Sequence, residues 1–223
     1  MRYVKRTVML SEGEVVRLHR PTFGVEGETY GLIARTTQLD ARLAPSVFGL
    51  GLLEAISDQD ILAGADPKDR DGDGISGRAA IVDGAIGRIG WKARQSRIAD
   101  QNVKALSLDI GIGNRRHAAL WGGCTAAQTK CRDGPHGGSS RHDGLAGVAE
   151  DTATARGWRT ALLWGIGLTQ AVSGHAFYLH DDRARGLTEV VLWHGGEAQP
   201  ARNRFAALAK RHRDALLVFL TSL

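Results

Sequence analysis

Glycine is the feature of this sequence that most constrains its fold, because it occupies 29 of the 223 positions and is spread along the chain. Glycine loses more backbone entropy than any other residue when it enters a helix or strand, and it favours turns. Long regular elements are therefore disfavoured. Since 43% of the residues are apolar, the chain can still bury a hydrophobic core. We expect a folded protein of short elements joined by long loops.

The periodic stretches between the glycines are mostly helical. Residues 7–21 instead read as two short strands around a turn at 11–14, which predicts a β-hairpin near the start. Residues 200–223 predict one or two closing helices, with Pro200 near the first helical position. The predicted fold class is therefore mainly α, with long loops and a small N-terminal β-hairpin. Apolar faces at helical spacing are Val47, Leu50, Leu53 and Ile56; Ala99, Val103, Leu106 and Ile110; and Leu187, Val190, Val191 and His194.

The charge pattern argues against nucleic-acid binding. The net charge is +5, but the basic residues are dispersed and form no stripe or nucleic-acid motif. A dispersed positive surface suits an acidic protein partner, such as an electron donor. No stretch reaches the roughly 18–20 apolar residues of a membrane span, and no apolar segment of an export signal follows the basic start. We expect a chain without an export signal, truncated from a longer protein.

An acidic loop resembles part of a calcium site. Asp69, Asp71 and Asp73 occupy positions 1, 3 and 5 of a calcium-binding loop, and a glycine follows at position 6. The backbone carbonyl of Ile75 then falls at position 7. Position 12, which is a bidentate glutamate in an EF-hand, is Ala80 here. The loop is therefore either an incomplete Ca²⁺ site or a solvated acidic turn.

The two cysteines, Cys124 and Cys131, are separated by six residues in "CTAAQTKC". Four roles are open for them. They can bind zinc together with His117, His136 or His142, although the spacing matches no standard zinc pattern. They can also form a redox dithiol, remain free thiols, or close a short loop as a disulfide if the chain is exported.

Segments along nearly the whole chain resemble one family, the di-haem oxidoreductases, also called thiol oxidoreductases. This family is related to the bacterial di-haem cytochrome c peroxidases. No segment is decisive alone, but their joint occurrence in the family's order is specific. The segments are "ARLAPSVFGLGLLEAI" (41–56), "ADPKDRDGDGISGR" (65–78), "IGRIGWKA" (86–93), "CTAAQTKC" (124–131), "GWRTALLWGIGLTQ" (157–170), "LHDDRARGLTEVVLWHGGEA" (179–198) and "LLVFLTSL" (216–223).

The resemblance implies a periplasmic cytochrome c peroxidase-like scaffold with two c-type haems and electron-transfer or peroxidase-like activity. Each haem of such a protein is attached through C-x-x-C-H, in which the histidine ligates the iron. This chain contains neither motif. Residues 1–123 would be the N-terminal part of the scaffold with the acidic loop, and residues 124–223 a remnant of the C-terminal cytochrome c-like domain. We expect impaired activity.

Several residues are candidates for the haem site by this resemblance. His194 lies near the place of an axial ligand; the alternative is a buried or helix-capping histidine. His180 and Arg183 can tune a redox centre or bind a haem propionate, and the alternative is a salt-bridged turn. Trp91 can lie between redox centres or simply pack in the core. Asp182 stands where the family has glycine, and aspartate tolerates a positive φ less well.

Two further interpretations compete with a haem oxidoreductase. One is a haem-free, calcium-stabilised structural or interaction protein, or a non-functional gene fragment. The other is a partial polypeptide that associates with a second chain carrying the haem segments. Since helices that faced a haem lose an apolar partner without it, we also expect exposed apolar surface around Leu192 and Trp193 and self-association.

Overall fold

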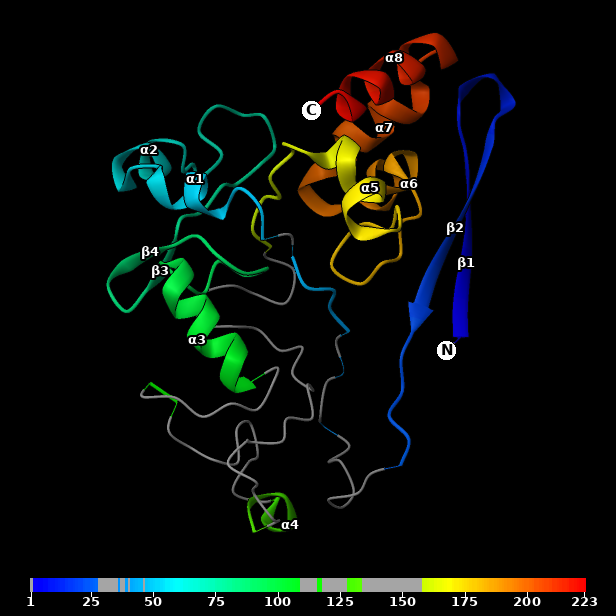
Figure 1. Cartoon of the computed structure of the whole chain (residues 1–223). Helices are drawn as coiled ribbons and strands as arrows, with labels where there is room; N and C mark the ends of the chain where they lie inside the picture. Colours follow the sequence, from blue (N-terminus) through cyan, green and yellow to red (C-terminus); the bar gives the residue numbers. More distant parts are fainter. Residues whose placement is uncertain are drawn as a thin grey trace.

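The computed structural model describes residues 2–27, 36, 39, 41–45, 47–108, 116–117, 128–133 and 158–223. This part of the chain consists of short helices and two small antiparallel hairpins (Figure 1). The predicted mainly α fold with an N-terminal β-hairpin is confirmed. None of the described helices is long and apolar enough to cross a membrane. The helical elements are α1 (Leu50–Ala55), α2 (Asp58–Ala63), α3 (Ile98–Leu108), α4 (Thr129–Arg132), α5 (Thr169–Ser173), α6 (Leu187–Trp193), α7 (Gln199–Ala207) and α8 (Lys210–Thr221), with 3₁₀ turns η1 (Ser11–Gly13), η2 (Ile166–Leu168) and η3 (Gly196–Ala198).

The N-terminal hairpin pairs β1 (Arg2–Met9) with β2 (Val15–Thr22) along their full lengths, from Arg2 opposite Thr22 to Met9 opposite Val15. Its turn is η1, in which Glu12 takes a left-handed φ of 63°. A second, shorter hairpin pairs β3 (Ala80–Val82) with β4 (Ala85–Gly87).

The first hydrophobic cluster joins the N-terminal hairpin to the C-terminal helices, which lie beside it in Figure 1. Leu10 and Leu18 of the hairpin region pack with Leu192 of α6 and Phe205 of α7, and each of these side chains is buried. Trp193 is half-buried against the same cluster. The expectation that Leu192 and Trp193 are exposed is therefore wrong, because the hairpin covers them.

Large apolar side chains are exposed on another surface instead. Leu168 of η2 and Val172 of α5 are 59% and 62% exposed, and Val218 and Phe219 of α8 are 68% and 57% exposed. The backbones of η2 and α8 are in close contact, since a Cβ on Gly167 would lie only 2.0 Å from the carbonyl oxygen of Thr221. We call Leu168, Val172, Val218 and Phe219 the α5–α8 apolar surface.

The second hydrophobic cluster joins segments of the first half of the chain to Leu162. Leu50 and Leu53 of α1 pack on Ile89, which follows β4, and all three are buried. Ile98 at the start of α3 and Leu162 pack against them. This cluster holds together the segments that flank the acidic loop and the tryptophan of "GWKA".

Two predicted helical faces differ from the structure. Val47 is 80% exposed, because Gly49 has a φ of 77° and α1 begins only at Leu50. In α3 the buried residue is Ser107, whereas Leu106 is 40% exposed. A serine permits closer backbone approach than a leucine, so the tertiary packing selects a face that hydrophobicity does not indicate.

Candidate functional site

Three of the sequence segments that carry the resemblance meet at His180. Its imidazole ring stacks on the indole ring of Trp158, with centroids 3.9 Å apart and planes 18° apart. The ring of Trp91 presents an edge-on contact to the same histidine, with centroids 6.4 Å apart. We call Trp91, Trp158 and His180 the aromatic cluster. The structure thus brings together the predicted residues Trp91 and His180 and adds Trp158.

Backbone hydrogen bonds hold this cluster in place. The Leu43 N–H donates to the carbonyl of His180 at 2.7 Å, and Trp91 Nε1 donates to the carbonyl of Leu43 at 2.6 Å. The Arg159 N–H in turn donates to the carbonyl of Trp91 at 2.9 Å. A half-buried indole that has its polar atom satisfied is stably positioned, so the cluster is a rigid unit built from four distant segments.

Cations surround the tryptophan of this cluster. Lys92 is only 4% exposed, and its Nζ lies 3.4 Å from the centroid of the Trp158 ring. The guanidinium carbon of Arg42 lies 5.4 Å from the same centroid. Such cation–π contacts stabilise a buried ammonium group. They also give the surroundings of His180 a positive electrostatic character.

Asp181 and Arg183 form a bidentate ion pair beside the cluster. Arg183 Nε donates to Asp181 Oδ1 at 2.7 Å, and its Nη2 donates to Oδ2 at 2.5 Å. Burial would raise the pKa of Asp181, but the hydrogen bonds and charge of Arg183, with a smaller effect of His180, lower it overall. The geometry is that of a salt-bridged turn. A further role of Arg183 in binding a haem propionate stays a prediction.

His194 lies at the C-terminal end of α6 and is exposed. The prediction that it shares the apolar helix face is wrong, because the helix ends at Trp193 and His194 is extended, with a ψ of 148°. Its Nδ1 lies 2.7 Å from the carbonyl oxygen of Val190. Because a carbonyl only accepts, Nδ1 must carry the proton, which leaves the Nε2 lone pair for a metal.

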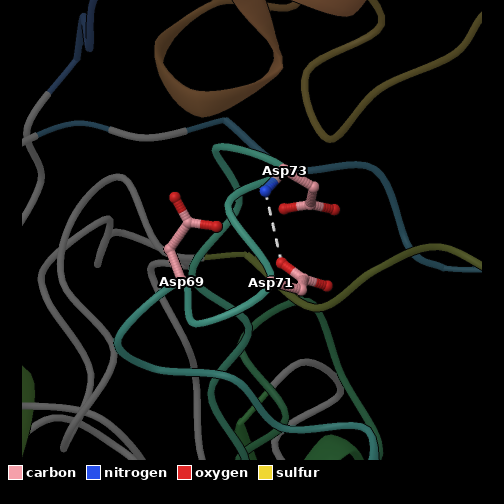
Figure 2. A group of neighbouring side chains, drawn as sticks. All are labelled: Asp69, Asp71 and Asp73. Carbon is pink, nitrogen blue, oxygen red and sulfur yellow. Dashed lines mark hydrogen bonds between the residues drawn. The ribbon is translucent and has the colours of Figure 1, made fainter.

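The acidic loop places its three predicted carboxylates together, as Figure 2 shows. Each of Asp69, Asp71 and Asp73 offers a ligand oxygen, and these oxygens lie within 4.8 Å of one another. The Asp73 N–H donates to Asp71 Oδ1 at 3.2 Å, and the Ile75 N–H donates to Asp73 Oδ1 at 2.8 Å. In these hydrogen bonds the backbone N–H groups of the loop donate to its own carboxylates, and they stabilise the tight turn.

A fourth carboxylate reaches the end of this loop from the far side of the sequence. Glu197 of η3 accepts a hydrogen bond from the Ser76 N–H at 3.0 Å and another from the Ser76 hydroxyl. The side-chain hydrogen bond of Ser76, followed by its backbone bond, lowers the pKa of Glu197. Glu197 is not among the residues predicted from the sequence, because 121 residues separate it from Ser76 and no local pattern indicates the contact.

The cysteine segment is described only in part. Cys131 lies in α4, is 5% exposed and is disulfide-bonded. Cys124, His136 and His142 lie outside the described residues, so the pairing of the two cysteines stays a prediction. His117 lines a pocket next to β3 and β4 together with Asp100 and Arg116.

Comparison with known proteins gives one family. The model described as "di-haem oxidoreductase, putative peroxidase" matches residues 1–119 and 139–223. The matched ranges include the aromatic cluster, His194 and the acidic loop, whereas both cysteines fall between them. Searches among curated proteins and among solved structures found no match.

Proposed function

Since the chain belongs to the di-haem oxidoreductase family, we propose that it is an electron-transfer scaffold of the c-type cytochrome or peroxidase-like kind. The observation that carries this proposal is the aromatic cluster, in which three family-type segments converge on His180. Packed aromatic rings flanked by cations are a suitable wall for a planar, anionic redox cofactor. The chain's positive charge favours an acidic electron-donor protein.

The residues present do not fit covalent haem attachment. A c-type haem requires C-x-x-C-H, and these 223 residues contain no such motif. The cysteine that the structure describes, Cys131, is disulfide-bonded. The redox activity of the family would therefore require one of two arrangements in this protein. Either the haem is attached covalently through residues of another polypeptide, or it is held by axial ligation alone.

Axial ligation fits the donor set better. His194 is exposed and has its Nδ1 proton fixed on the Val190 carbonyl, which is the arrangement of an imidazole that ligates a metal through Nε2. Arg183 would meet a propionate only in competition with Asp181. Trp91 and His180 of the aromatic cluster stay candidates for the surroundings of a haem, and no contact in the described part of the chain joins them to His194. Haem iron, when bound, would supply the electron transfer.

A haem titration tests this proposal. We expect that haemin added to the purified protein gives a Soret band that co-elutes with the protein in gel filtration, and that His194→Ala shifts or abolishes the band. His212→Ala, which alters an exposed histidine of α8, is the matched control. Protein that stays colourless, or an identical spectrum in both variants, would contradict ligation by His194.

The periplasm is the compartment that we propose. Members of this family are typically periplasmic. The disulfide bond of Cys131 agrees with an oxidising compartment, because disulfides persist there and are rare in the cytosol. Labelling of free thiols in periplasmic extracts, with and without reduction, tests this proposal together with the pairing of Cys131 with Cys124.

A second candidate function is that of a haem-free, calcium-stabilised structural or interaction protein. The observation that favours it is the acidic loop, in which Asp69, Asp71 and Asp73 each offer an oxygen within 4.8 Å of the others (Figure 2). Ca²⁺ takes six to eight oxygen ligands, and the carbonyl of Ile75 is a further candidate. Self-association would accompany this function, whereas a partner chain that carries the haem segments belongs to the separate hypothesis of a partial polypeptide.

A further inference from the structure

An open pocket of about 580 Å³ lies between the N-terminal hairpin and the loop that joins α5 to α6. The volume is in the range of sites for small molecules. The pocket is separate from the acidic loop and from His194, since none of those residues lines it. The side chains that matter for its chemistry are Tyr3, Lys5, Phe23, Phe177, Asp182 and Arg185.

The walls of the pocket are aromatic and exposed. Tyr3, Phe23 and Phe177 all line it, and they are 55%, 41% and 43% exposed. These three large rings face a common open space and expose apolar surface to solvent. A planar ligand would bury that surface. Rings stack favourably on one another in offset or edge-on geometry, so the walls favour an aromatic ligand.

Besides Arg42, whose guanidinium lies over the Trp158 ring, three Lys and Arg side chains line the pocket. Arg183 is engaged by Asp181, and Arg185 donates to Glu189 and to a backbone carbonyl of β2. Lys5 of β1 forms no ion pair with any residue in the described part of the chain, and it lies opposite His19 in the hairpin. The amino group of Lys5 is therefore the natural partner of a carboxylate in this pocket.

Asp182 contributes an acceptor that the protein leaves unused. Its Oδ1 is buried and has no hydrogen-bond partner among the residues that the structure describes. Its backbone φ is 58°, in the left-handed region that costs a residue other than glycine free energy. A strained residue with an unpaired buried oxygen at the edge of a pocket is typical of a binding position. Burial also raises the pKa of Asp182.

We propose that this pocket binds a small aromatic acid that carries a hydroxyl group. The carboxylate of the ligand pairs with Lys5, its hydroxyl donates a hydrogen bond to the Asp182 carboxylate, and its ring packs against Tyr3, Phe23 and Phe177. The side chains that contact the ligand differ from those assigned to calcium and to haem, and Arg183, a haem-propionate candidate, also lines the pocket.

Calorimetric titration tests the proposal, with 4-hydroxybenzoate and 4-hydroxyphenylacetate as the probes, which differ in the distance between their polar ends. We expect one of the two probes to bind the wild-type protein more tightly than the other. That probe should bind at least about tenfold more tightly than its analogue without the hydroxyl group. It should exceed 4-methylphenol, which lacks the acid, by the same factor. No saturable binding of either probe at millimolar concentration would overturn the proposal.

Two variants assign the polar contacts. Asp182→Gly should remove the difference in affinity between the probe and its analogue without the hydroxyl group, and it should keep the difference between the probe and 4-methylphenol. The glycine also relieves the backbone strain at this position. Lys5→Met keeps an apolar side chain of similar length. It should remove the difference in affinity between the probe and 4-methylphenol, and keep the difference that the hydroxyl group makes. Lys68→Met, at an exposed lysine outside the pocket, is the control. Equal weakening by Lys5→Met and Lys68→Met would mean non-specific charge attraction and would overturn the assignment.

Discussion

The imidazole ring of His180 lies nearly parallel to the indole ring of Trp158, with their centroids 3.9 Å apart. This contact, together with the Leu43 and Trp91 hydrogen bonds, ties the loop before α6 to three earlier segments of the chain. The aromatic cluster therefore connects distant segments in the part of the chain that the structure describes, whether or not a cofactor binds beside it.

Replacing His180 tests the contribution of the ring stack. His180→Ala should lower the free energy of unfolding by about 1 kcal/mol, since stacked rings contribute about 0.5–1.5 kcal/mol beyond area burial. His180→Phe keeps a planar ring and should retain most of that stability. Urea unfolding followed by tryptophan fluorescence measures both. If the phenylalanine variant is as unstable as the alanine variant, stacking is not the stabilising contact.

Calcium should stabilise the protein through the acidic loop. Ca²⁺ at about 100 times its Kd would add about 2.7 kcal/mol to the free energy of unfolding, because it binds the folded protein and not the unfolded chain. Asp71→Ala should remove the gain, and Glu54→Gln, at an exposed carboxylate of α1, should leave it intact. Thermal melts with Ca²⁺, Mg²⁺ and chelator measure the effect. A melt that excess Ca²⁺ leaves unchanged would rule out this site.

The pair of Arg213 and Glu14 should stabilise the docking of the hairpin turn on α8. Arg213 is 2% exposed, and its Nη2 donates to Glu14 Oε2 at 2.7 Å while its Nη1 donates to Ser11 Oγ and to the carbonyl of Leu208. Glu14→Gln should cost about 1 kcal/mol, because Glu14 is 43% exposed and solvent screens the pair. Arg213→Met should cost about 1–3 kcal/mol, because it leaves the partly buried acceptors of Ser11 and Leu208 without their donor. Arg211→Met, at an exposed neighbour, is the control in urea unfolding and should change little.

Asp182 should destabilise the folded protein at neutral pH. Burial raises its pKa in the folded state, so the folded state holds the proton more tightly, and stability falls as the pH rises from the ordinary aspartate pKa through the raised one. Asp182→Asn should remove this part of the pH dependence. Asp182→Gly should in addition relieve the backbone strain at φ 58° and gain about 1–2 kcal/mol. Melting temperatures of the three proteins between acid and neutral pH measure this. Parallel pH profiles would contradict it.

The α5–α8 apolar surface should bind hydrophobic dyes and favour self-association. Val218 is 68% exposed, so Val218→Glu should reduce anilinonaphthalene sulfonate fluorescence and shift sedimentation toward the monomer, with a change in stability of about 0.5 kcal/mol or less. Gln59→Glu, at an exposed position of α2, controls for the added charge. A wild-type protein that is monomeric and does not bind the dye would contradict the prediction.

Local interactions made part of this molecule predictable. The hairpin follows from strand residues around a turn with glycine, and the acidic loop follows from alternating aspartates and glycines. In both cases the residues that decide the conformation are neighbours in the chain. The end of α6 was misplaced by one residue, and that error was enough to move His194 from an apolar face to an exposed cap.

The sequence by itself determined the family, the fold class, the positions of most elements and the three carboxylates of the loop, because each depends on local pattern. Only the tertiary structure decided which surfaces are buried. Leu192 is covered by a hairpin that lies almost at the other end of the chain, and Glu197 reaches Ser76 across 121 residues. Such contacts depend on how elements dock, and the free energy of docking is shared among many side chains that have no fixed spacing in the sequence.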